Sequence, residues 1–152
     1  MGYKFEVEDV GPQQVLSIRT RTSLEEMPLK LGKSFEAIIA YLGSLGKQPS
    51  EAPFVAYYNM DMSDLDIEIG FPVSESLEGS GDIESNVISG GKKAFCMYKG
   101  SYSNLESVYE EMSTWMSENN HKPTGIVYEF YYNSPTEVPE SELLTKIVFP
   151  LE

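Results

Sequence analysis

The chain has 152 residues, of which 41% are hydrophobic and 23% charged, a composition that predicts one folded domain and excludes a disordered chain. Its 11 basic and 24 acidic residues give a net charge of −13, so phosphate backbones repel it and direct nucleic-acid binding is not expected. Cationic small molecules and basic protein surfaces are the partners that this charge favours. The absence of a long apolar run and of a signal-like N-terminus, together with a single cysteine, predicts a cytoplasmic protein that neither spans a membrane nor forms an internal disulfide.

The first half of the chain has the pattern β-α-β-β. Apolar residues from Leu31 to Leu42 recur at helical spacing and predict a helix that begins near Pro28 and ends at Gly43 to Gly46. Alternating or apolar runs predict the strands around it. These strands are 15–21, with 3–7 as an extension before the Gly11-Pro12 interruption, 53–59 and 65–73.

A segment rich in Ser, Gly and acidic residues, 74–82, predicts a linker to a second β-α-β-β half. The helix of this half is expected to begin at a capping box formed by Ser103 and Glu106 and to end before Pro123. Its strands are expected at 93–99, 125–133 and 143–150.

The two halves echo each other in sequence. "FVAYYNM" and "YEFYYNS" each precede a strand that ends in Phe-Pro, and Tyr57 and Tyr131 are 74 residues apart. We therefore predict an α+β fold with duplicated β-α-β-β halves at about 3–73 and 83–151, forming one domain over 1–152. In this fold an antiparallel sheet carries two helices on one face and leaves a ligand groove on the other.

Glu129 is the one carboxylate in the aromatic segment "GIVYEFYYNS". An ionised carboxylate avoids apolar surroundings unless something compensates its lost hydration. On a strand it shares a face with Val127 and Tyr131, whereas Tyr128 and Phe130 point the other way. The more apolar row is expected to pack under the helices, so Glu129 is predicted to face the groove. The alternative is a solvated glutamate on the open face of an antiparallel sheet.

The repeat makes Val55 and Tyr57 the counterparts of Glu129 and Tyr131. An aromatic floor with a single negative charge suits a flat hydrophobic cation. The expected ligand-binding residues are Val55, Tyr57, Val127, Glu129 and Tyr131.

Three segments carry a resemblance to a known family: "PFVAYYNM…DLDIEIGFPV", "YKGSYSNL" and "GIVYEFYYNSPTEVPESELLTKIVFPL". Their order and spacing over 3–151 resemble the GyrI-like (gyrase-inhibitory-protein-like) effector-binding family, which includes the drug-sensing domains of multidrug-responsive transcription activators. The resemblance implies the duplicated fold and an acidic residue, at Glu129, that recognises cationic lipophilic ligands. Because there is no room for a DNA-binding domain before Tyr3 or after Leu151, we expect a stand-alone binding protein.

Two other functions stay open. Some stand-alone members of this family hydrolyse DNA-alkylating compounds that contain a cyclopropane. In such a detoxifying hydrolase Glu129 would activate water, and Tyr131 or Tyr57 would stabilise the developing phenolate. The resemblance also permits docking on a basic enzyme surface as an inhibitor of DNA gyrase.

Three remaining side chains are candidate site residues. Trp115 is expected to pack in the core, with pocket lining as the alternative. His121 is expected to be solvated, haem binding being a weak alternative, and Cys96 to be an inert core thiol. With one cysteine and one histidine, no metal site and no cofactor are expected.

Overall fold

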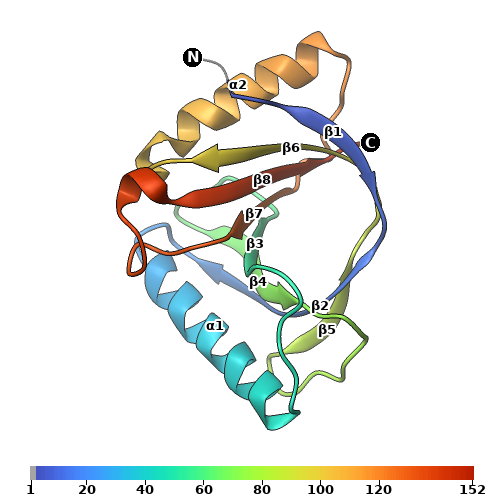
Figure 1. The fold of residues 1–152 in the computed structure, drawn as a ribbon, viewed down its shortest axis with the longest axis vertical. Coiled ribbons are helices and arrows are strands. Elements are labelled where there is room, and N and C mark those ends of the chain that lie inside the picture. The colour runs from blue at the N-terminus through green and yellow to red at the C-terminus, as the bar shows by residue number, and fades with distance from the viewer. Residues whose placement is uncertain (1–2) are drawn as a thin grey trace. The chain divides into compact units, whose positions relative to one another are not determined.

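The computed structural model describes residues 3–152, so Met1 and Gly2 of the predicted domain 1–152 lie outside the described range. The chain forms two compact units (Figure 1). The central unit is Gly11–Gly90, and the terminal unit combines residues 3–10 with Gly91–Glu152. Each unit contains antiparallel strands and one α-helix, which confirms the α+β fold. Within residues 3–152, neither helix is long and apolar enough to cross a membrane.

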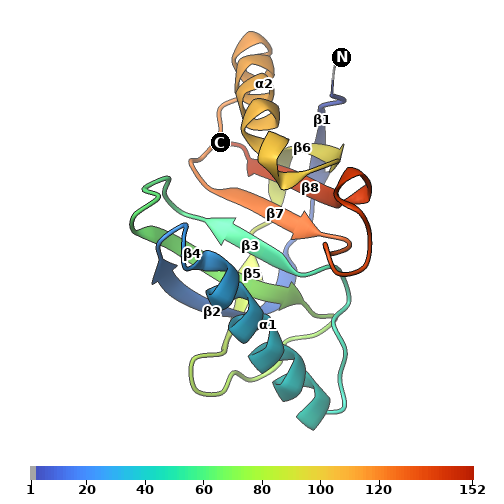
Figure 2. The ribbon, with the colours of Figure 1, turned by 90° about the vertical axis from the view of Figure 1, so that its left-hand side faces the viewer.

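The central unit has four strands in the order β3-β4-β2-β5. Helix α1 (Met27–Ser44) lies against β2 and β4, as Figure 2 shows, and buries Ile38 and Leu42 there. The helix carries Pro28 in its first turn and is followed by Gly46 at a φ of 67°, as the sequence predicts. The strands are β2 (Gln13–Thr22), β3 (Phe54–Tyr57), β4 (Leu65–Pro72) and β5 (Glu84–Ile88).

Gly70 of β4 is required by close packing in the central unit. A Cβ atom at this position would lie 2.5 Å from the carbonyl oxygen of Leu16 and 3.0 Å from Cζ of Phe54. Because a backbone atom blocks the space, we expect Gly70→Ala to lower the free energy of unfolding by about 1 to 3 kcal/mol. Urea denaturation measures this loss. The matched control is Gly43→Ala in α1, where nothing lies within 4 Å and the change should stabilise the protein by up to about 1 kcal/mol.

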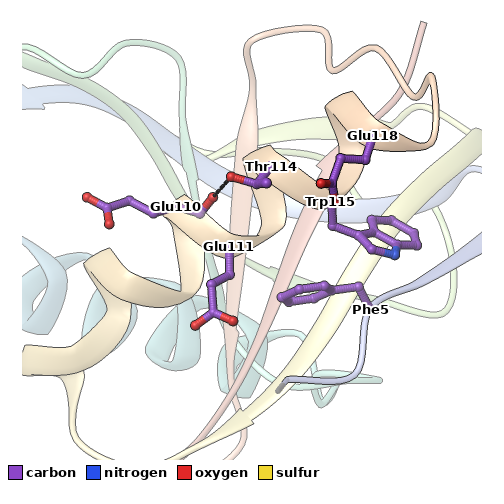
Figure 3. A pocket seen from close by; sticks show the side chains of 6 residues that line it. All are labelled: Phe5, Glu110, Glu111, Thr114, Trp115 and Glu118. Carbon is purple, nitrogen blue, oxygen red and sulfur yellow. Dashed lines mark hydrogen bonds between the residues drawn. The ribbon is translucent and has the colours of Figure 1, made fainter. Parts of the chain in front are cut away.

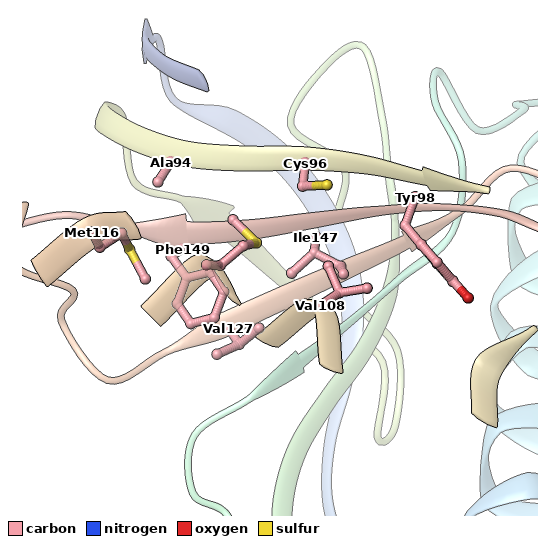
Figure 4. Packing of buried hydrophobic residues seen from close by; sticks show 9 residues of the cluster. Ala94, Cys96, Tyr98, Val108, Met116, Val127, Ile147 and Phe149 are labelled. Carbon is pink, nitrogen blue, oxygen red and sulfur yellow. The ribbon is translucent and has the colours of Figure 1, made fainter. Parts of the chain in front are cut away.

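The terminal unit has the strand order β7-β8-β6-β1. Helix α2 (Leu105–Glu118) follows a short 3₁₀ turn, Tyr102–Asn104, and a second such turn, Glu140–Glu142, precedes the last strand. One face of α2 buries Val108, Met112 and Met116 against the sheet (Figure 4). The strands are β1 (Glu6–Val10), β6 (Gly91–Lys99), β7 (Val127–Tyr131) and β8 (Leu144–Pro150).

Two local predictions were wrong, and one strand was not predicted. The N-terminal strand does not extend β2; it pairs with β6 from Glu6 opposite Phe95 onward. Glu84–Ile88, which follows the predicted linker 74–82, forms the unpredicted strand β5 and pairs with β2. The cap is also different: Ser101, not Ser103, accepts a hydrogen bond through its side chain, from the backbone N–H of Ser103.

The strand registers of the two units match at the positions that the sequence repeat aligned. Glu129 lies opposite Ile147 in the β7–β8 ladder, and Val55 lies opposite Ile69 in the β3–β4 ladder. Tyr131 and Tyr57 come two residues later in each case. Internal duplication stays a prediction, and this shared register supports it.

Candidate functional site

The side of β7 that carries Glu129 points toward helix α2. Val127 packs in one cluster with Val108 and Met112 of the helix, and side chains two residues apart on a strand share a face. The prediction that Val127, Glu129 and Tyr131 face away from the helices was therefore wrong. Both faces of β7 are largely buried. The difference in hydrophobicity between its two rows of side chains therefore did not show which row packs against the helix.

Two tyrosine hydroxyls compensate the buried charge of Glu129. This residue is only 5% exposed. Tyr131 donates to one carboxylate oxygen at 2.6 Å, and Tyr109 of α2 donates to the other. Hydrogen bonds to an ionised acceptor are about twice as strong as neutral ones. They explain how a carboxylate is kept in an aromatic strand without exposure to water.

Tyr102 extends this arrangement toward solvent. Its ring meets that of Tyr131 edge to face, with 6.0 Å between centroids, and 37% of the residue is exposed. Burial of the phenol, and then the nearby charge of Glu129, raise the pKa of Tyr102 above its usual value. The site therefore has three tyrosines around one carboxylate, ordered from a solvent-facing ring to a buried anion.

Thr145 adds a buried polar atom to the same face. It lies directly opposite Tyr131 in the β7–β8 ladder and is fully buried. Within residues 3–152 its hydroxyl oxygen has no hydrogen-bond partner. A buried hydroxyl is usually paired, so this one is available to a ligand or a water molecule.

The other two predicted site residues belong to the central unit. Val55 is fully buried, and the hydroxyl of Tyr57 lies 4.0 Å from the sulfur of Met27 at the start of α1. Val55 and Tyr57 pair with Ile69 and Ile67 of β4. These two positions share a face of β4 with Phe71, which packs under α1. The side chains of Val55 and Tyr57 therefore lie on the face of the sheet that the helix covers. Their contribution to a ligand site stays a proposal.

Glu68 of β4 is a second buried carboxylate that sequence reasoning missed. It is 4% exposed and accepts hydrogen bonds from Ser17 at 2.5 Å, Tyr58 at 2.5 Å and Asn86 at 2.9 Å. These donors come from β2, from the residue that follows β3, and from β5, so the carboxylate links neighbouring strands. We interpret Glu68 as a structural charge, whereas Glu129 is surrounded by aromatic rings.

Tyr102 and Tyr109 are the site residues that sequence reasoning did not assign. Tyr109 follows Val108 of the buried face of α2, and its phenol was the available signal that this helix contacts a polar group. The ring of Tyr109 meets that of Phe149 at 5.9 Å between centroids, and Phe149 belongs to the apolar cluster under α2.

Cys96 is buried as predicted, and we expect it to react slowly. Burial, and then the negative charge of Glu111, raise the pKa of its thiol to about 11. At pH 7.5 roughly one thiol in several thousand is then a thiolate, the reactive form. An aromatic disulfide reagent should modify the native protein at least tenfold more slowly than the protein in concentrated urea. Equal rates in the two conditions would show that the thiol is accessible.

Solved structures with the same fold share little sequence with this chain. EcmrR, determined in a complex with DNA, superposes with a TM-score of 0.85 at 21% identity; the match covers 99% of this chain and 57% of that one. A hydrolase from Listeria innocua gives 0.72 at 13% identity, covering 99% of this chain and 92% of the hydrolase. SAV2435 bound to tetraphenylphosphonium gives 0.69 at 9% identity, covering 98% and 94%.

No curated protein sequence matches the chain. A family model does, over residues 3–152, and it describes GyrI-like small-molecule-binding domains. The buried carboxylate, its ring of tyrosines and the α+β fold are compatible with that description. The chain belongs to the family of GyrI-like small-molecule-binding domains.

Proposed function

We propose that this protein binds hydrophobic cationic small molecules and that Glu129 is the group that recognises their charge. The observation that carries the proposal is the buried carboxylate held by the hydroxyls of Tyr109 and Tyr131. A carboxylate that folding has already removed from water attracts a cation more strongly than a solvated one does. The net charge of −13 raises the local concentration of cations further.

The aromatic rings provide the apolar part of the proposed site. Tyr131 and Tyr102 present ring faces and edges next to Glu129, and cations bind favourably within about 6 Å of such rings. In the terminal unit the proposed ligand-binding residues are Val127, Glu129 and Tyr131, predicted from the sequence, together with Tyr102 and Tyr109. Val55 and Tyr57, their repeat counterparts, are proposed as ligand-binding residues of the central unit. SAV2435, which shares the fold, was determined with the hydrophobic cation tetraphenylphosphonium, and this supports the ligand class.

A calorimetric titration with tetraphenylphosphonium tests the proposal, with triphenylphosphine oxide as a neutral compound that carries three of the same rings. We expect the cation to bind at least tenfold more tightly than the neutral compound. Equal affinities would show that the site selects aromatic surface without recognising charge. No detectable binding of either compound would remove the proposed function.

A hydrolase that opens cyclopropane-containing compounds is the second candidate, because a protein of the same fold is described as a hydrolase. In such a reaction Glu129 takes a proton from water, the water oxygen bonds to a ring carbon, and one C–C bond of the cyclopropane breaks. The electron pair passes through the conjugated ring to its carbonyl oxygen, which becomes a phenolate that Tyr131 stabilises with its hydroxyl. This oxygen then takes up the proton from Glu129, so the product gains one water. Mass spectrometry of such a substrate after incubation distinguishes the candidates, since turnover adds the mass of water and binding alone leaves the compound intact.

A further inference from the structure

Thr145 of β8 carries a buried hydroxyl close to Glu129 that the recognition of charge does not use. It lies directly opposite Tyr131 of β7 and Tyr98 of β6, so a tyrosine flanks it on each side. Tyr98 and Ile147 belong to the apolar cluster under α2 (Figure 4), and residues two apart on a strand share a face. The side chain of Thr145 therefore points toward the helix, as that of Glu129 does.

The tyrosine hydroxyls beside Thr145 donate to other acceptors. Tyr131 donates to Glu129, and Tyr98 donates to the backbone carbonyl oxygen of Ser101 at 2.8 Å. Thr145 is fully buried, and among the described residues 3–152 no group forms a hydrogen bond with its Oγ1. Burying a hydroxyl without a partner costs free energy, so most buried polar side-chain atoms are paired. An unpaired hydroxyl beside a proposed ligand-binding carboxylate therefore indicates that the ligand supplies the missing partner.

The position of Thr145 relative to Glu129 indicates how close that partner is to the charge. Glu129 lies opposite Ile147, two residues after Thr145, so the two side chains are diagonal neighbours on one face of the β7–β8 ladder. Diagonal neighbours have Cβ atoms about 7 to 8 Å apart. A hydrogen bond joins heavy atoms about 3 Å apart, so one nitrogen atom between the two side chains can reach both.

A protonated amine satisfies both side chains at once. Its positive charge pairs with Glu129, whose oxygens can each accept a further hydrogen bond beside those from the tyrosines. Its N–H donates to Oγ1 of Thr145, which has two lone pairs. A quaternary ammonium or phosphonium group has the charge but no N–H, so it leaves the hydroxyl unpaired. A neutral alcohol pairs with the hydroxyl but gains nothing from the charge of Glu129.

We propose that the Glu129 site prefers protonated amines to quaternary cations, because Thr145 accepts a hydrogen bond from the ammonium N–H. The inference rests on the proposed function, which by itself requires only a cation and the carboxylate. The ligand class is then a hydrophobic amine that is protonated near neutral pH. Its aromatic part contacts Tyr131 and Tyr102, the latter at the exposed end of the site.

Two matched ligands test this preference. They are dimethyl(naphthylmethyl)amine and the quaternary salt formed by adding one methyl group to its nitrogen. Both carry one positive charge and the same aromatic group, and only the amine has an N–H. In calorimetric titrations we expect the amine to bind at least tenfold more tightly. Equal affinities, or tighter binding of the quaternary salt, would overturn the preference and leave the proposed function intact, whereas binding of neither cation would remove both.

Thr145→Val assigns the preference to the hydroxyl, because valine keeps the branched shape of threonine and suits a buried strand position. We expect this variant to bind the amine and the quaternary salt with affinities within twofold of each other, and Thr145→Ser to keep the preference. The control is Thr114→Val on an exposed position of α2. There the hydroxyl donates to the carbonyl oxygen of Glu110 at 3.1 Å (Figure 3), so the preference should stay as in the unchanged protein.

Two results for Thr145→Val would contradict the proposal. If both cations bound more weakly by the same factor, Thr145 would support the packing of the site without distinguishing its ligands. Thermal unfolding without ligand gives the second result. Replacing an unpaired buried hydroxyl with a methyl group should leave Tm unchanged or raise it. A Tm lowered by several degrees, or a variant that does not fold, would show that the hydroxyl already has a partner inside the protein.

Discussion

Glu129→Gln is expected to weaken the binding of a hydrophobic cation about 10- to 100-fold, while a neutral aromatic compound loses little. A charge-assisted interaction in a desolvated site is worth about 1.5 to 3 kcal/mol, and the amide keeps the shape of the carboxylate without its charge. Tyr109 and Tyr131 can still donate to the remaining carbonyl oxygen, so the site keeps part of its internal hydrogen bonding. Fluorescence anisotropy with a cationic dye measures the change.

The matched control for this variant is Glu106→Gln, which removes the same charge from an exposed position in the first turn of α2. We expect it to change the affinity less than twofold, because solvent and salt screen a surface charge. If both variants weakened the dye equally, the long-range field of the protein would account for binding and Glu129 would have no specific role. A retained affinity in Glu129→Gln would have the same meaning.

Met112→Ala is expected to lower the free energy of unfolding by about 2 to 5 kcal/mol, because it deletes a fully buried side chain and leaves a cavity between α2 and the sheet. Met112 packs in the cluster that contains Val127, so this variant also tests the side of β7 on which Glu129 lies. Urea denaturation followed by circular dichroism gives the value.

Met97→Ala is the control of the same residue type in the same unit. Met97 is 47% exposed on β6, so its truncation should cost about 0.5 kcal/mol or less. Similar losses for the two variants would contradict the packing described for α2. If Met112→Ala alone caused a negligible loss of unfolding free energy, α2 would not pack against the sheet through Met112.

The elements that the sequence predicted well are those with strong local signals. The helix at Met27–Ser44 follows from apolar spacing and Pro28, and the α+β class follows from the order of helices and strands. Strand alternation alone predicts that Tyr131 shares a face with Glu129, and in the structure Tyr131 donates a hydrogen bond to Glu129. These features depend on residues close together in the chain.

The features that were missed depend on partners distant in the sequence. Strand β5, Glu84–Ile88, is polar and mostly exposed, so it has no hydrophobic alternation, and only its ladder with β2 defines it. The N-terminal strand could not be assigned to β6 because its partner lies about 85 residues away, as in the pairing of Glu8 with Lys93.

The side on which Glu129 lies was missed for a physical reason of a different kind. Hydrophobicity placed the aromatic row under the helix, because a carboxylate there is costly. The cost is offset by the hydroxyl of Tyr109, whose ring packs against the apolar cluster under α2. A tyrosine satisfies both requirements, packing with its ring and donating with its hydroxyl.

A crystal structure of the protein with tetraphenylphosphonium tests most directly whether Glu129 recognises cations. We predict that the phosphorus lies within about 6 Å of the Glu129 carboxylate and that a phenyl group of the ligand contacts Tyr131 or Tyr102. The hydrogen bond from at least one tyrosine to Glu129 is expected to rearrange as the cation enters. A cation bound elsewhere, with the carboxylate still held by Tyr109 and Tyr131, would contradict the proposed role of Glu129.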